Sequence, residues 1–236
     1  TDVTISIAQL QQPTRVLRNR LWERADKFVM SKEEYAKLFP NDPYGNEDDM
    51  ATWKTGNEIF RKTFNTGKES SIELDKLKKA DAGKYVVTLN AKDKYGETVE
   101  WKQYITVYGS NDNKIPENIA FWSTVNKQSA EPTEQVSALF GSAVKSIMAL
   151  YEVEHDNKLI KREWIPIGEL QKRINETVRE EHRGNFFIHL TAVALNRAQT
   201  VPYTIVVPWS NKDLKVEMTT FRNKILRSVI CILILL

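Results

Sequence analysis

The chain has 236 residues, which is enough for about two sandwich domains of about 100 residues each. Hydrophobic residues make up 41% of the sequence and charged residues 28%, as in an ordinary soluble protein. A net charge of +3 is too small to indicate a nucleic-acid or anionic-membrane partner, and the single cysteine, Cys231, excludes an internal disulfide and a cysteine-rich metal site.

The chain opens with a strand pattern, because apolar residues alternate with polar or small ones at Val3, Ile5 and Ile7. Residues 11–57 then lose this alternation. A connection of that length is uncommon in a compact domain and usually carries local structure or function. Residues 58–64 return to the alternating pattern and predict a second strand.

One short helix is predicted inside the long connection. Ser31 and Glu34 have the spacing of a capping box, in which the serine caps the helix and the glutamate reaches back to it. An apolar stripe follows, and Pro40 ends the pattern.

The acidic loop at residues 41–49, NDPYGNEDD, contains the carboxylates and carbonyls that calcium prefers. Its spacing differs from that of an EF-hand, because Pro43 and Gly45 stand where that loop places side-chain oxygen ligands. We therefore expect a solvated loop rather than a calcium site.

Residues 71–108 carry three successive strand patterns. Ile72 and Leu74 form a short alternating run, and two longer runs follow, separated by a turn at residues 93–96. The apolar face of the second run comprises Tyr85, Val87, Leu89 and Ala91, and that of the third comprises Val99, Trp101, Ile105 and Val107.

Asp81, Gly83 and Tyr85 indicate an immunoglobulin-like corner. A D-x-G-x-Y sequence just before a strand is used by such sandwiches to pin the crossing between two sheets through the tyrosine hydroxyl. Antibody domains place a cysteine two residues later, where this chain has Val87, so packing rather than a disulfide must hold the sheets together. We assign the motif a structural role, because it offers no reactive group.

Residues 1–110 are predicted to form an incomplete first sandwich. About five strands can be read in them, whereas a complete sandwich of this type has about seven. We therefore expect the first strands of this domain to lie upstream of Thr1.

A small polar linker at residues 109–113 leads into a second series of strands, which predicts a complete sandwich over residues 111–208. The strand patterns lie at residues 119–125, 136–143, 147–153, 159–167, 186–195 and 203–207.

Residues 168–179 are ambiguous. Leu170, Ile174 and Val178 satisfy both the helical spacing of four and the strand period of two. The pattern alone favours a helix, while the neighbouring strands keep a strand open.

Segments spread over nearly the whole chain up to Lys224 recur together in one family. They are residues 10–24 and the FPNDPYGNEDD loop at 39–49 in the first half, and residues 151–153, 161–164, 180–185 and 196–224, which include Trp209, in the second. Their combination resembles the bacterial alpha-2-macroglobulin family, in particular its large members in Bacteroides-type bacteria.

The resemblance implies tandem macroglobulin-like sandwiches, with an insertion at residues 11–57 of the first and a third domain starting at residues 209–226. By the same comparison residues 168–178 should be a strand. It also implies a fragment of a very large protein of the periplasm or cell envelope of a Gram-negative bacterium. Such proteins trap endopeptidases, so the expected partners are target endopeptidases, through the full-length parent, and neighbouring macroglobulin-like domains.

Three features depart from the family pattern. The thioester sequence C-x-E-Q is absent, and no bait segment can be identified. Residues 227–236, RSVICILILL, replace the expected domain continuation. Their apolar part is far shorter than the about 20 residues of a membrane-spanning helix, so we expect a truncated or out-of-frame end rather than an anchor.

No catalytic or metal-binding constellation is readable. His155 and His182 fall in predicted turns and His189 in a strand, without a spacing that places two on one face. Adjacent carboxylates such as residues 48–49 and 180–181 would point apart in an extended chain. We therefore expect neither an enzyme nor a cofactor.

The six tryptophans are predicted to pack in cores and between domains, with Trp101 and Trp209 among the structural residues. The expected function is a non-catalytic structural segment of a protease trap. The alternative is a cell-surface adhesion or glycan-binding sandwich, whose distinguishing feature would be an exposed aromatic patch with convergent polar groups.

Overall fold

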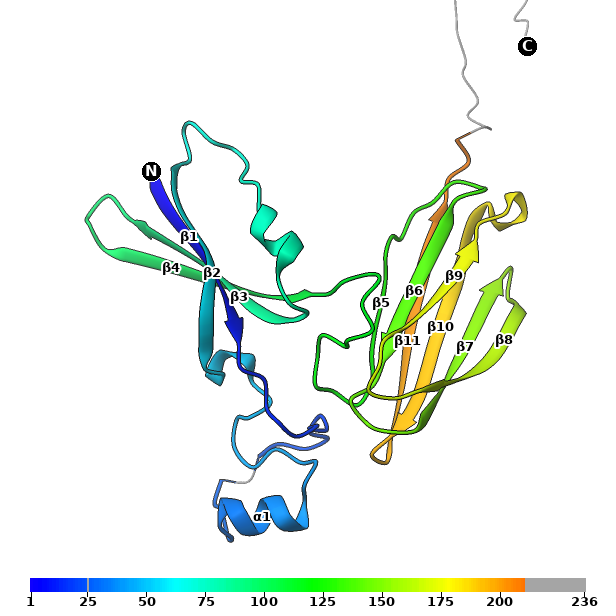
Figure 1. Ribbon diagram of the computed structural model, residues 1–236, viewed down its shortest axis with the longest axis horizontal. Coiled ribbons are helices and arrows are strands. Elements are labelled where there is room, and N and C mark those ends of the chain that lie inside the picture. Colours follow the sequence, from blue (N-terminus) through cyan, green and yellow to red (C-terminus); the bar gives the residue numbers. More distant parts are fainter. Residues whose placement is uncertain (25, 211–236) are drawn as a thin grey trace, which may run out of the picture.

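The computed structural model describes residues 1–24 and 26–210, and Figure 1 shows them as two all-β units joined in sequence. Their strands form three antiparallel sheets. The predicted all-β class with tandem sandwich-like units is therefore confirmed. The expectations for residues 211–226 and for the apolar tail at 227–236 lie outside the described residues.

The first unit is a four-stranded sheet. Its strands are β1 (Asp2–Leu10), β2 (Thr55–Asn65), β3 (Gly83–Lys92) and β4 (Thr98–Val107), in the spatial order β2-β1-β3-β4. Short helices lie in its connections: α1 (Lys32–Leu38) and η1 (Met50–Thr52) between β1 and β2, and η2 (Asp75–Lys79) between β2 and β3. None of the helices in the described part of the chain has the length and apolar content needed to cross a membrane.

The second unit is a two-layer sandwich. One layer contains β5 (Trp122–Val125), β6 (Gln135–Gly141) and β9 (Lys172–Thr177), in the order β5-β6-β9. The other contains β7 (Ile147–His155), β8 (Lys158–Ile167), β10 (Gly184–Ala194) and β11 (Arg197–Val207), in the order β11-β10-β7-β8, and η3 (Glu180–His182) joins β9 to β10.

The core of the second unit lies between its two layers. The side chains with no exposed surface include Val136, Ala138, Phe140, Tyr151, Val153, Phe186, Ile188, Leu190, Ile205 and Val207. Burial of each larger apolar side chain contributes about 1.5–3 kcal/mol. Packing therefore holds the two sheets together, in a described region that contains no cysteine.

The sheet of the first unit repeats the connectivity of the larger sheet of the second. In each, the first strand pairs with the second and the third, and the third pairs with the fourth, so that β2-β1-β3-β4 corresponds to β8-β7-β10-β11. The crossing segment at residues 66–82 corresponds by chain order to residues 168–183, which contain β9. No counterpart of β5 and β6 accompanies the first sheet within the described residues.

The strand predicted at Ile72 and Leu74 is wrong. These residues lie in an irregular segment that leads into η2. The corresponding strand of the second unit, β9, obtains its ladder of hydrogen bonds from β6. Without such a neighbour the backbone groups of residues 71–74 have no ladder to join, so the first unit has one strand fewer than predicted.

Residues 172–177 form a strand, β9, so the strand reading is confirmed and the helix favoured by the pattern alone is wrong. The strand pairs with β6 from Gln135↔Thr177 to Phe140↔Lys172. Pairing with a buried neighbour decides a pattern whose apolar spacing fits both structures.

The predicted tyrosine corner is present. Tyr85 is 1% exposed, and its hydroxyl donates a 2.9 Å hydrogen bond to the backbone carbonyl of Asp81. Gly83 lies where an added Cβ would approach the side-chain amide nitrogen of Gln9 at 3.1 Å, so a larger residue would have to displace it. The motif thus fixes the entry into β3.

The predicted capping box is also present. The Ser31 hydroxyl accepts from the Glu34 amide at 3.2 Å, and the Glu34 carboxylate accepts from the Ser31 amide at 3.1 Å. This reciprocal pair begins α1, as the spacing indicated.

The predicted core packing of the tryptophans is not found for four of them in the described residues. Trp101 is 51% exposed, because its face of the first sheet has no second layer in the described residues. Trp22, Trp164 and Trp209 are 70%, 61% and 48% exposed. Trp122, by contrast, is 5% exposed.

Candidate functional site at the domain junction

The long connection between β1 and β2 is folded, and arginines hold it together. The guanidinium of Arg18 forms a bidentate pair with Asp42, with nitrogen–oxygen distances of 2.8 and 2.5 Å. Arg20 donates to the backbone carbonyls of Pro43 at 2.5 Å and Gly45 at 3.0 Å. These contacts bind residues 15–24 to the acidic loop at residues 41–49.

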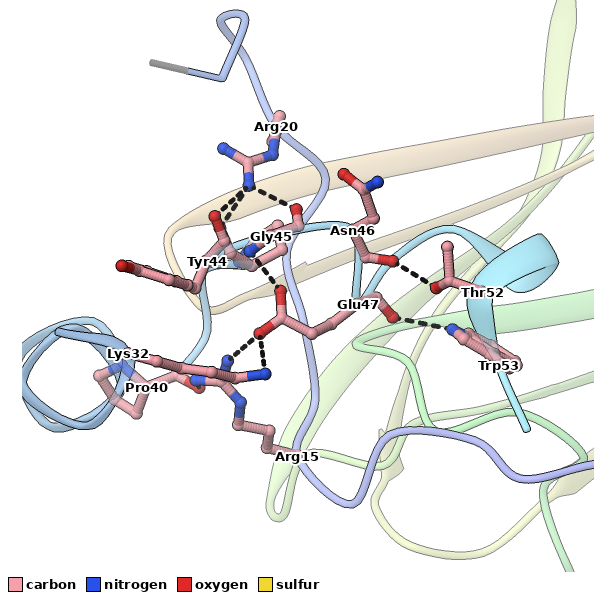
Figure 2. A network of polar contacts seen from close by, with 11 residues as sticks. Arg15, Arg20, Lys32, Pro40, Tyr44, Gly45, Asn46, Glu47, Thr52 and Trp53 are labelled. Atoms are coloured by element: carbon pink, nitrogen blue, oxygen red, sulfur yellow. Dashed lines mark hydrogen bonds and ion pairs between the residues drawn. The ribbon is translucent and has the colours of Figure 1, made fainter. Parts of the chain in front are cut away.

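Glu47 lies at the centre of a second network, which Figure 2 shows from close by. One carboxylate oxygen accepts from the Gly45 amide at 2.6 Å, and the other lies 3.2 Å from the Lys32 ammonium and 3.5 Å from the Arg15 guanidinium. The Glu47 carbonyl accepts from the indole N–H of Trp53 at 2.8 Å. The loop that resembled a cation site therefore directs Glu47 toward basic side chains of the same chain.

The environment of Glu47 lowers the pKa of its carboxyl group. Burial acts in the opposite direction, but the hydrogen bond from the Gly45 amide and the positive charge of Lys32 outweigh it. Glu47 is therefore ionised at neutral pH, as the ion pairs require.

Residues 114–119, which follow the linker, are bound to the start of this folded connection by amide side chains. The side chain of Gln12 donates to the Pro116 carbonyl at 2.8 Å and accepts from the Asn118 amide at 2.9 Å. The side chain of Asn118 donates to the Pro13 carbonyl at 2.7 Å. Three hydrogen bonds thus connect the end of β1 to the segment that leads into the second unit.

A nearly buried ion pair adds to this junction. The Lys84 ammonium lies 2.7 Å from Glu117, and the two side chains are 16% and 14% exposed. The hydroxyl of Thr106 donates to the same carboxylate at 2.8 Å and accepts from Lys84 at 2.8 Å. Glu117 therefore joins the segment at residues 114–119 to both β3 and β4.

Two further contacts reach the second unit itself. The rings of Tyr108 and Trp122 meet edge to face with centroids 5.4 Å apart, and Arg18 donates to the Leu195 carbonyl in the β10–β11 hairpin at 3.2 Å. A cavity of about 160 Å³ remains at the junction, lined in part by Met50, Trp53 and Ile119.

Three residues singled out in the sequence lie beside the junction, and three residues that form it were not predicted. Tyr85, Asp81 and Gly83 lie beside it, because the corner positions the neighbouring Lys84. Trp101 lies in β4, and Trp209 follows the end of β11. Gln12, Glu117 and Asn118 carry no sequence signal, since isolated polar residues near a linker are ordinary.

Two of the histidines come together in a way that the sequence spacing did not predict. His155, at the end of β7, and His182, in η3, come together with ring centroids 5.6 Å apart, although their sequence spacing gave no sign of it. Among the described residues no group of three or more candidate ligands could hold a metal ion. The adjacent carboxylates Glu180 and Glu181 pair with different arginines, Arg183 and Arg179.

The contacts of the junction hold the two units together. Its carboxylates face cations and its amide side chains face backbone groups, an arrangement suited to positioning one unit against the other.

Searches with the whole sequence find no matching protein-family model and no matching curated protein.

Proposed function

We propose that the chain is a non-catalytic structural segment of an endopeptidase inhibitor of the kind that the sequence resembles, a bacterial alpha-2-macroglobulin. The observation that carries the proposal is the repeated strand order, β2-β1-β3-β4 and β8-β7-β10-β11, in two units joined by a built junction. A chain of similar sandwiches is the architecture that such a trap requires.

The first unit, in this proposal, is a macroglobulin-like sandwich whose other layer is completed by two strands from upstream of Thr1. Val99 and Trp101, which are 55% and 51% exposed, lie on the face that this layer would cover. Residues 71–74 would then pair with one of the added strands, as β9 pairs with β6. Residues 111–208 form the complete second domain, and residues 209–226 begin a third.

The junction supports a role in transmitting rearrangement. A nearly buried ion pair and three side-chain hydrogen bonds resist independent motion of the two units, because separating them would leave polar groups unpaired. Movement of one sandwich would therefore carry the next, in the periplasm or cell envelope of a Gram-negative bacterium. The partners are target endopeptidases, bound by the full-length parent, and the neighbouring domains.

The test uses the full-length parent. Purified parent is incubated with endopeptidases of different specificity, and hydrolysis of a protein substrate and of a small peptide substrate is measured. A trap that surrounds the protease reduces cleavage of the protein substrate and leaves cleavage of the peptide largely intact. Unchanged cleavage of both substrates, with unchanged sedimentation of the parent after protease addition, would overturn the proposal.

A glycan-binding module is the second candidate, and one surface favours it. Trp164 is 61% exposed on the outer face of the larger sheet, and it lies opposite Leu150. On the same face Arg162 forms a 2.6 Å ion pair with Glu152, and Val193 is 63% exposed. An exposed aromatic ring beside polar groups is a feature of saccharide recognition. Saccharide titrations of the chain and its Trp164→Ala variant, with Trp22→Ala as control, distinguish the two functions.

A further inference from the structure

The turn between β9 and β10 contains a buried histidine. The side chain of His182 is 2% exposed, and its ring lies 4.7 Å from that of Phe186 and 5.6 Å from that of His155. Its Nε2 atom has no hydrogen-bond partner in the described part of the chain. A buried titratable group of this kind has a preferred protonation state.

The hydrogen bonds around His182 fix its tautomer. The Arg179 amide donates to Nδ1 of His182 at 3.2 Å, so the proton of the neutral ring is on Nε2. In His155 the arrangement is reversed, because its Nδ1 lies 2.9 Å from the Asn185 carbonyl and must donate to it. A second proton on His182 would turn its Nδ1 into a donor that faces the Arg179 N–H, and the hydrogen bond that begins η3 would be lost.

The next residue, Arg183, ties the end of β11 to the same turn. Its guanidinium is 7% exposed and lies 2.9 Å from Glu131 and 3.1 Å from Glu180. It also donates to the Pro208 carbonyl, directly after β11. The hydrogen bond and charge of Glu180, with those of Glu131, raise the pKa of Arg183, so this side chain stays charged.

The groups that face His182 come from several elements. Those that act on its ring are Arg179 and Glu181 in its own turn, His155 at the end of β7 and Glu176 in β9. Glu180 and Arg183 pair with each other in the same turn, and Asp156 lies 3.6 Å from His155. Burial lowers the pKa of His182, and the electrostatic effects of His155 and Arg179 add to this, while Glu181 and Glu176 oppose it. Glu176 is already engaged by the Tyr151 hydroxyl at 3.2 Å and the Lys161 ammonium at 3.0 Å.

We propose that His182 and Arg183 form a pH-sensitive latch that holds the C-terminal end of the second sandwich. With His182 neutral, η3 is intact and Arg183 holds Pro208 against the start of β10, where Gly184 pairs with Val207. Protonation of His182 breaks the contact with the Arg179 amide and releases η3 and the residues after β11. The latch therefore controls how firmly residues 208–210, directly after β11, are held.

The sign of the pH dependence follows from the buried neutral ring. A lowered pKa means that the latched state prefers the neutral form, so its stability is fully present above the ordinary histidine pKa of 6.5. That stability is lost as the pH falls from 6.5 through the lower pKa of the latched state. The latch is closed at neutral pH and opens on acidification.

The test measures amide hydrogen exchange of the whole chain by NMR, expressed as protection factors corrected for intrinsic rates, between pH 7.5 and pH 5.5. Protection of the hydrogen-bonded amides of Arg179, His182, Arg183 and Val207 should fall by up to about tenfold per pH unit below 6.5, the limit for uptake of one proton. His182→Asn keeps an acceptor oxygen near the position of Nδ1 but cannot be protonated, and should abolish the pH dependence. The control His189→Asn should retain it.

A second variant and a second observable complete the test. Arg183→Gln should lower the protection of Val207 at pH 7.5, where His182 is still neutral. In the wild-type chain, the His182 Cε1–H resonance should titrate below pH 6.5, together with the loss of protection. A midpoint at or above 6.5, pH-independent protection of these amides, or an equal fall in His182→Asn and wild type would overturn the latch.

Discussion

The Tyr85 hydroxyl donates a 2.9 Å hydrogen bond to the backbone carbonyl of Asp81, four residues earlier, and so closes the corner through which the chain enters β3. Burial raises the pKa of Tyr85, and the negative charge of Asp81 adds to the shift. The phenol therefore remains protonated and remains a donor throughout the physiological range. The same corner presents Lys84 to Glu117, so local geometry in the first unit and attachment to the second are connected.

Replacing Tyr85 by phenylalanine should test this corner. Tyr85→Phe keeps the ring but leaves the Asp81 carbonyl without its partner, and should lower the free energy of unfolding by about 1 kcal/mol. Urea denaturation measures the change. Tyr95→Phe, at a site 79% exposed in the β3–β4 connection, should change it by less than about 0.5 kcal/mol. Equal unfolding midpoints for the two variants would mean that the corner bond contributes nothing to stability.

The elements predicted correctly from sequence are those specified by nearby residues. The corner depends on Asp81, Gly83 and Tyr85, and the capping box on Ser31 and Glu34, so each motif contains its own hydrogen-bond partners. The alternating patterns of the second unit also predicted its strands, because one face of each strand packs against the core. Residues that are close in the sequence therefore determine these elements.

The errors concern features that depend on distant partners. Ile72 and Leu74 have a strand pattern but no strand to pair with, and residues 172–177 have an ambiguous pattern that pairing with β6 resolves. The junction could not be foreseen, because Gln12 meets Pro116 only after more than a hundred intervening residues have folded. The meeting of His155 and His182 depends in the same way on the packing of two turns.

Because one face of the first sheet is open, we expect the loss of an aromatic side chain there to cost less stability than in the second unit. Phe186→Ala removes a ring with no exposed surface from the core of the second unit and should cost about 3–5 kcal/mol. Trp101→Ala removes a ring that is 51% exposed and should cost about 1 kcal/mol. Thermal and urea unfolding of both variants provide the comparison. A cost for Trp101→Ala as large as that for Phe186→Ala would show that a second layer covers this face in the isolated chain.

Acidification should open the acidic loop of the long connection. Since the pKa of Glu47 lies below its ordinary value of 4.5, the contribution of this carboxylate is present above pH 4.5 and is lost as the pH falls through the lower folded-state pKa. The Gly45 amide donates to Glu47, so its proton chemical shift should report the transition in an NMR titration with a midpoint below 4.5. Glu47→Gln should remove the transition, while Glu69→Gln, which alters an unrelated pair with Lys62, should leave it unchanged. A Gly45 midpoint at or above 4.5 would contradict the assigned hydrogen bonds.

The ion pair between Lys84 and Glu117 should be coupled energetically, because both side chains are largely buried and share the Thr106 hydroxyl. Glu117→Ala leaves the Lys84 ammonium unpaired and should destabilise the chain by about 2 kcal/mol, whereas the double variant with Lys84→Ala should lose less than the sum of the single variants.

A double-mutant cycle in urea should therefore give a coupling energy of about 1 kcal/mol or more. Lys102 and Glu100 provide the matched control: they form a pair of the same length, 2.7 Å, with both side chains 48% exposed, and should show no measurable coupling because solvent screens them. Small-angle scattering of Glu117→Ala should also show a broader distribution of distances between the two units, since the ion pair is one of the few contacts that join them. Additive effects of Glu117→Ala and Lys84→Ala, with unchanged scattering, would mean that the junction does not hold the two units together.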